Sequence, residues 1–206
     1  MEPGARASAV DRAFALTSVV PLGAFLCFHL VDYARVLFGA TELGAKHAPS
    51  HVVLGLELVV VWLPLALHAL FGVVVWLQRR KFAETTPSRK ALVSVHRLAG
   101  GLLVPFLVDH FVRFRLPILR GERFASDSVQ VLAAELSRTD GGGLPWLAAA
   151  TLLGTASAAF HLGYGLARIA ERTPGLRGPI ARRAGFGIGL AVGVTGIFSV
   201  LRLATG

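Results

Sequence analysis

Long apolar stretches, separated by short polar segments, run along the whole chain. Five of them reach the roughly 20 mostly apolar residues that a helix needs to cross a bilayer. These stretches cover about residues 14–38, 52–78, 92–113, 144–167 and 184–203. The pattern therefore predicts an all-α integral membrane protein, in which five transmembrane helices form a single domain over residues 1–206.

The longest polar connection lies between the third and fourth stretches. Within it, residues 127–137 (DSVQVLAAELS) repeat their apolar side chains at helical spacing. Ser126 or Asp127 can cap the first turn, because a short side chain with an oxygen atom accepts a hydrogen bond from a free N–H group there. We expect a short helix that lies on the membrane surface.

The composition agrees with a membrane protein and excludes other classes. Hydrophobic residues make up 54% of the chain and the mean hydropathy is +0.63, which is too apolar for a soluble domain of this length. The net charge of +9 does not indicate nucleic-acid binding, because the basic residues form no stripe interleaved with aromatic side chains. The single cysteine, Cys27, excludes a disulfide framework and an iron–sulfur site in this chain.

The basic residues predict the orientation, because short cytoplasmic loops of membrane proteins are rich in Lys and Arg. The first apolar stretch has no clear small-residue cleavage site after it, so we expect a retained helix and not a signal peptide. With a cytoplasmic N-terminus, 13 of the 21 Lys and Arg residues lie on the cytoplasmic side. They are Arg6, Arg12, Arg79, Arg80, Lys81, Arg89, Lys90, Arg97, Arg168, Arg172, Arg177, Arg182 and Arg183. The C-terminus is then expected outside.

Each of the first four stretches contains one histidine deep in apolar sequence: His29, His68, His110 and His161. An ionisable group inside a membrane is costly and usually functional. At ~1.5 Å per residue, the first and third lie ~22 and ~27 Å from the cytoplasmic ends of their helices. The second and fourth lie ~15 and ~9 Å from those ends. Depth therefore predicts an outer pair, His29 with His110, and an inner pair, His68 with His161.

Each predicted pair comes from two helices that run in the same direction, so the two rings face each other diagonally across a four-helix bundle. Two neutral imidazoles in this arrangement are what bis-histidine ligation of haem requires. Glycines near the histidines leave room for a flat macrocycle; they are Gly23, Gly72, Gly100, Gly101 and Gly165. The alternative is that the histidines only form hydrogen bonds between helices.

The remaining histidines have weaker signals. His96 lies near the cytoplasmic face with Arg97 beside it. We expect this pair in the region of the haem propionates, where Arg97 is a charge partner. The alternatives are a solvated pair at the interface, or His96 as a competing inner ligand. His47 and His51 fall in an outer loop, where solvated side chains are expected.

Four segments in order resemble a known family. They are SVVPLGAFLCFHL, LELVVVWLPLALHALFG, HRLAGGLLVPFLVDH and FHLGYGLARI. The chain resembles the single-chain, five-helix, dihaem cytochrome b membrane subunits of menaquinone-linked succinate dehydrogenases and fumarate reductases. The resemblance covers most of the helical chain. It implies two haems b, menaquinone as substrate, and the same four histidines in the same pairs as haem ligands.

The resemblance also implies partners and a location. These are a flavoprotein subunit, which holds FAD and the dicarboxylate site, and an iron–sulfur subunit on the cytoplasmic face of a bacterial inner membrane. This chain would be the electron-transferring, quinone-reactive subunit of that oxidoreductase, in succinate oxidation or fumarate reduction. The fifth stretch, with Gly185, Gly189 and Gly193 at four-residue spacing, indicates packing and not ligation.

Glu57 is a carboxylate well inside the second stretch, at the depth of the outer pair. An unpaired carboxylate there would be costly, and quinone chemistry couples electrons to protons, so we expect it to exchange protons with the quinone. The family has a glutamate at this place. Asp32 and Asp109 are weaker candidates near the interface. Some relatives have a glutamate on helix four where this chain has Ala159, which makes a proton path there doubtful.

Two other functions fit parts of the pattern. One is a dihaem cytochrome of another quinone-linked oxidoreductase, such as a formate dehydrogenase or nitrate reductase, although these concentrate their ligands on fewer helices. The other is a haem-free structural membrane anchor.

Overall fold

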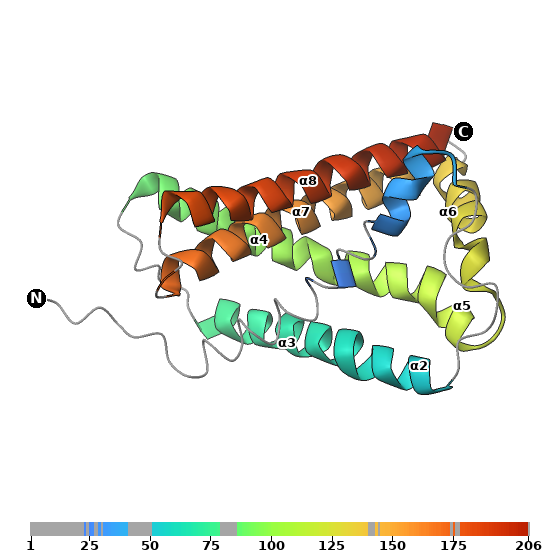
Figure 1. The fold of residues 1–206 in the computed structure, drawn as a ribbon, viewed down its shortest axis with the longest axis horizontal. Coiled ribbons are helices and arrows are strands. Elements are labelled where there is room, and N and C mark those ends of the chain that lie inside the picture. The colour runs from blue at the N-terminus through green and yellow to red at the C-terminus, as the bar shows by residue number, and fades with distance from the viewer. Residues whose placement is uncertain are drawn as a thin grey trace, which may run out of the picture.

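The computed structural model describes residues 23, 25–26, 29, 31–40, 51–78, 86–139, 143, 145–173, 175 and 178–205. Within these residues every regular element is a helix (Figure 1). Four helices are long and apolar enough to cross a membrane, and they cover Val52–Val74, Pro87–Leu119, Trp146–Glu171 and Pro179–Thr205. The protein therefore has the all-helical, membrane-spanning character that the apolar stretches predict.

The first predicted span, 14–38, lies largely outside the described residues. Within it, residues 23, 25–26, 29 and 31–37 are helical. Gly39 ends this helix with a φ of 88°, and its N–H donates to the Val36 carbonyl at 3.0 Å. Glycine suits this left-handed position because it has no Cβ. A fifth membrane-spanning helix stays a prediction.

The second and third spans share an unusual construction. In the second, α2 (His51–Glu57) passes through the π-helical turn η1 (Leu58–Trp62) into α3 (Leu63–Gln78). In the third, α4 (Pro87–His110) passes through the π-helical turn η2 (Phe111–Arg115) into α5 (Leu116–Leu119). In both cases a proline, Pro64 or Pro117, is the second residue after the π turn. The wider turn accommodates the proline ring and its missing N–H group.

The third span is longer than its apolar stretch. It begins at Pro87, because Thr86 has extended dihedrals and Pro87 takes the first helical position, where its missing N–H costs nothing. It ends at Leu119, so the expected end at residue 113 is wrong. Arg113 and Arg115 lie inside this helix, and both guanidinium groups form ion pairs.

The fourth and fifth spans form the tightest contact of the structure. The helices α7 (Trp146–Arg172) and α8 (Pro179–Thr205) both extend past the apolar stretches that predicted them and lie along each other (Figure 1). A Cβ on Gly189 would lie 2.6 Å from the Ala159 carbonyl oxygen, and one on Gly185 would lie 2.7 Å from the Ala167 nitrogen. Only glycine allows the two backbones to approach this closely. The predicted packing role of the fifth stretch is confirmed.

The polar connection forms the 3₁₀ turn η3 (Ala125–Asp127) and α6 (Ser128–Ser137), close to the predicted helix 127–137. Its apolar side is buried in a cluster with the end of the first helix and of α8. The members are Val36, Val129, Leu132, Leu136, Ala148, Val200 and Leu203. This side of α6 therefore packs against the end of the bundle, and its expected position on the membrane surface stays a prediction. Asp127 takes the N-cap position but makes no capping hydrogen bond.

The second span is attached to the others much more loosely. In its most apolar 18-residue segment, only 6% of the residues are buried. The same fraction is buried in the third span, whereas the fourth and fifth spans have 28% and 33% buried. Large side chains along it, including Leu63 and Leu70, are exposed. Apolar packing therefore fixes α7 and α8, whereas the position of α3 beside α4 depends on other contacts.

The glycine contact between α7 and α8 can be tested directly. Gly189→Ala should lower the unfolding free energy of the purified protein by about 1–3 kcal/mol, because the new methyl group forces the two backbones apart. Gly187→Ala is the matched control, since no atom lies within 4 Å of a Cβ at that position. Thermal unfolding in detergent is the measurement. Equal midpoints for the two variants would contradict the contact.

Candidate haem and quinone sites

The structure brings the four membrane histidines together in two pairs. The ring centres of His29 and His110 lie 6.0 Å apart with an interplanar angle of 85°. Those of His68 and His161 also lie 6.0 Å apart, with an angle of 84°. These are the same two pairs that depth in the membrane predicts.

The spacing of the rings suits a metal between them. A bond from a metal to an imidazole nitrogen is about 2 Å long, so two rings on opposite sides of one metal have centres roughly 6 Å apart. A direct hydrogen bond between two imidazoles, at about 3 Å between nitrogens, would bring the centres to roughly 5 Å. The observed 6.0 Å is compatible with ligation and is longer than a direct hydrogen bond between the rings would give.

The set of donors suits haem in particular. Two imidazoles leave a bare ion with too few ligands, whereas a porphyrin supplies the other four. Added Cβ atoms on Gly23, Gly72 and Gly101 would meet no atom within 4 Å, so there is open space beside these glycines.

The two pairs lie at different levels of the bundle. The ring of His161 contacts α4 at His96, whereas the ring of His29 contacts α4 at His110. These two points on α4 are separated by 14 residues in the numbering, which is about 21 Å along a helix. The structure thus has an inner and an outer histidine pair along one helix.

The side chain of His161 is held in a defined state. Its Nδ1 lies 3.2 Å from the backbone carbonyl oxygen of His96. A carbonyl only accepts hydrogen bonds, so Nδ1 donates and Nε2 keeps its lone pair. Such a bond orients a metal-binding histidine. Gly100 makes room for the ring, because a Cβ there would lie 2.9 Å from its Cε1.

His96 lies against the inner pair, but it cannot be the ligand on the opposite side of an iron from His161. The two rings stack with centres 4.0 Å apart and 10° between their planes. Ligands on opposite sides of one iron point their nitrogens at each other and do not stack face to face. His96 also contacts Tyr164, and its Nδ1 is buried without a hydrogen-bond partner among the described residues. Arg97 beside it is half-buried.

Aromatic side chains surround the outer pair. Phe25 stacks on His29 with ring centres 5.3 Å apart, and Tyr33 contacts the same ring at 4.7 Å. The Ser199 hydroxyl of α8 donates to the Tyr33 carbonyl at 3.1 Å, which ties this end of the first helix to the packed core. Phe106 and Phe114 lie one turn before and one turn after His110 and contact its ring.

Glu57 is not the unpaired carboxylate that the apolar sequence around it indicates. It forms an ion pair with Arg115, and it accepts a hydrogen bond from Trp62 Nε1 at 2.8 Å. The Trp62 ring in turn contacts Phe111, the residue after His110, with centres 4.6 Å apart. The π turns η1 and η2 are thus joined at the level of the outer pair. Arg115 is a site residue that the sequence analysis missed.

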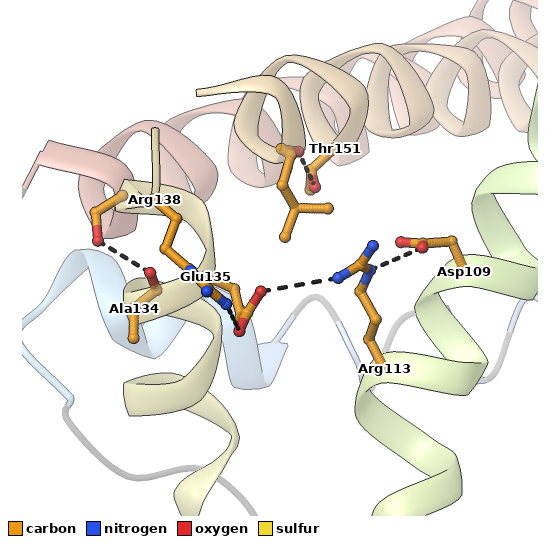
Figure 2. Close-up of polar contacts among 8 residues, drawn as sticks. Asp109, Arg113, Ala134, Glu135, Arg138 and Thr151 are labelled. Atoms are coloured by element: carbon orange, nitrogen blue, oxygen red, sulfur yellow. Dashed lines mark hydrogen bonds and ion pairs between the residues drawn. The ribbon is translucent and has the colours of Figure 1, made fainter. Parts of the chain in front are cut away.

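The weaker acidic candidates also have partners. Asp32 lies 3.7 Å from Arg35 in an exposed pair. Figure 2 shows Arg113 between Asp109 of α4, at 2.7 Å, and Glu135 of α6, at 3.8 Å. Asp109 therefore helps to hold α6 against the third span. The pair Asp109–Arg113 has four-residue spacing, a signal by which the sequence could have revealed it.

Other predicted positions are outside this region or outside the described residues. His47 lies outside the described residues, and nothing is described of the His51 side chain at the start of α2. Ala159 lies in the contact between α7 and α8, where a Cβ on Gly193 would be 3.0 Å from its own Cβ. There is thus little room for a longer side chain at this position, and the doubt about a proton path there stays a prediction.

Comparison of the chain with models of known protein families, with curated proteins and with solved structures finds no match.

The Glu57–Arg115 pair can be tested by a double-mutant cycle. Arg115→Met should cost about 1–3 kcal/mol of unfolding free energy, because it leaves a carboxylate in the membrane without its charge partner. Glu57→Gln combined with Arg115→Met should cost less than the sum of the single changes. Thermal unfolding in detergent measures all three, and Arg120→Met is the exposed control. Additivity within about 0.5 kcal/mol would show that the two side chains do not interact.

Proposed function

We propose that this chain is the dihaem cytochrome b membrane anchor of a succinate:menaquinone oxidoreductase or fumarate reductase. It would pass electrons between an iron–sulfur subunit and membrane menaquinone through two haems b. The observation that carries the proposal is the geometry of the histidines: four helices each supply one, and they form two pairs with ring centres 6.0 Å apart.

The residues present fit two haems. His29 and His110 would hold the outer one, and His68 and His161 the inner one. Haem supplies a one-electron carrier with two axial positions for imidazole. The bond from His161 Nδ1 to the His96 carbonyl leaves Nε2 as the ligand nitrogen. At each pair the chain would supply two imidazole ligands, and the hydrogen bond to the His96 carbonyl orients the ring of His161.

The inner pair has polar neighbours suited to propionate carboxylates. His96 Nδ1 is buried and has no protein partner among the described residues, so an acceptor or donor from a bound molecule can satisfy it. Arg97 follows it in the chain and can form a charge-assisted hydrogen bond with a carboxylate. We propose both residues for the propionate region.

The outer pair has an acid beside it. Contacts from Glu57 to Trp62 and from Trp62 to Phe111 bring this carboxylate to the level of His110. Reduction of a quinone consumes two electrons and two protons, so a proton donor beside the outer haem is required. We propose that Glu57 exchanges protons with menaquinone, and that Arg115 neutralises the carboxylate charge between turnovers.

The two ends of the bundle suggest how the chain sits in a complex. Basic residues gather where α4 and α8 begin and α7 ends, including Arg89, Arg168 and Arg182. Because basic loops of membrane proteins stay inside, we propose that this end is cytoplasmic, with the N-terminus inside and the C-terminus outside. The iron–sulfur and flavoprotein subunits would dock at this end, on the cytoplasmic face of a bacterial inner membrane.

The alternatives predict different outcomes. In dihaem cytochromes of the formate dehydrogenase or nitrate reductase type, ligands are concentrated on fewer helices, whereas here four helices contribute one each. A haem-free anchor would need no matched spacing in the two pairs. The deciding experiment is a reduced-minus-oxidised spectrum of the purified protein with identification of the co-purifying subunits. Two haems b per chain, together with a flavoprotein and an iron–sulfur protein, are expected. A protein without any haem b band would refute the proposal.

Substitution of single histidines tests the pairing. His29→Ala or His110→Ala should remove one spectral component, and His68→Ala or His161→Ala the other, because each iron loses one of its two protein ligands. His96→Phe is the matched control, since it keeps an aromatic ring against His161 and removes no ligand. We expect it to keep both haems. Loss of one haem in His96→Phe, with both retained in His68→Ala, would overturn the assignment of the inner pair.

A further inference from the structure

A pocket of about 440 Å³ lies where α4 and α8 begin and α7 ends. Four arginines line it: Arg89, Arg168, Arg182 and Arg183. Among the described residues, Glu171 is the only carboxylate in the lining, and it pairs with Arg168 at 3.1 Å and with Arg182 at 3.9 Å. Four positive charges and one negative charge leave the lining with a net charge of +3. A pocket with this balance attracts an anion.

The backbone adds to this attraction. Thr86 and Ser88 line the pocket at the first turn of α4, and Arg182 lines it one turn into α8. The N–H groups in the first turn of a helix have no partner within the helix, and the helix dipole gives this end a partial positive charge. The first turn of α4, a helix of 24 residues, thus lies beside these guanidinium groups. Guanidinium and backbone N–H groups together are typical ligands of a phosphate.

The depth of the pocket and its apolar wall indicate what carries the phosphate. The apolar spans begin at Pro87 and Pro179 and end at Glu171, so the pocket lies where a bilayer changes from hydrocarbon to headgroups. Leu92, Ala167 and Phe186 also line it, and Leu92 and Phe186 are partly exposed, at 39% and 38%. A free phosphate has no apolar part that could contact these side chains. A lipid has a phosphate for the arginines and acyl chains for the apolar side.

We propose that this pocket binds the headgroup phosphate of an anionic membrane phospholipid. The arginines and the first turn of α4 hold the phosphate, and Leu92 and Phe186 contact the glycerol and the first carbons of the acyl chains. Basic pockets between membrane helices commonly take such headgroups. The proposal does not depend on haem or quinone.

The test measures lipid retention. The full chain, with the subunits and cofactors that purify with it, is transferred to mixed micelles that contain phosphatidylglycerol or phosphatidylcholine, and native mass spectrometry counts the bound lipids. Phosphatidylglycerol should be retained in preference. Arg182→Gln with Arg183→Gln should weaken its binding at least about tenfold. Glu171→Gln should strengthen it, which a folding defect cannot imitate. Arg120→Gln with Arg123→Gln is the charge-matched control and should change nothing.

Several outcomes would overturn the proposal. Equal retention of both lipids, or equal losses in the pocket and control variants, would exclude a specific phosphate site. Displacement of the lipid by millimolar inorganic phosphate would indicate a free-anion site. Loss of one haem with unchanged lipid binding in Arg182→Gln with Arg183→Gln would assign the pocket to the propionates. Lipid binding by the isolated chain but not by the assembled complex would assign it to a protein partner. Absence of haem from the wild-type protein would refute the proposed function and leave the lipid result unaffected.

Discussion

The close backbone contact between α7 and α8 is the constraint on which the rest of the structure depends. The glycines of α8 bring that helix against Ala159, Gly163 and Ala167, and this contact fixes the position of α7. His161 lies on α7, two residues after Ala159, and its ring reaches α4 in the space above Gly100. Lipid tails are as apolar as leucine side chains, so this close packing must supply the order that the hydrophobic effect supplies in water.

The second span is positioned by polar contacts because little apolar packing holds it. Glu57, Trp62, Phe111 and Arg115 join the π turns of two helices at the outer end. An ion pair inside a membrane contributes little net stability, since both charges lose their hydration. Its value lies in specificity: the carboxylate and the guanidinium are satisfied in only one register of the two helices. That register also determines how far His68 lies from His161.

The sequence predicts the spans and the histidines well because both signals are local. Apolar stretches of sufficient length mark four of the helices, and a histidine is conspicuous in such a stretch. The end of the third span is predicted wrongly because hydropathy treats Arg113 and Arg115 as solvent-exposed, although the fold gives both of them partners. The partner of Arg115 is 58 residues away, and the stack of His96 on His161 joins residues 65 apart. No periodicity in a single sequence reports such contacts, whereas Asp109 and Arg113, four residues apart, could have been paired in advance.

Different charged residues lie at the two histidine levels, so the two ends of the proposed electron path are chemically different. Beside the inner pair, His96 has two basic neighbours, Arg97 next to it in sequence and Arg168 one turn beyond Tyr164. Beside the outer pair lie Glu57, Asp109 and their arginine partners. Positive charge at the inner level suits carboxylates of a prosthetic group and an acidic protein surface. Carboxylates at the outer level can accept and donate protons. A carrier of the proposed kind, which exchanges electrons with a soluble subunit at one end and both electrons and protons with a quinone at the other, would use this asymmetry, whereas a helix anchor without cofactors would not.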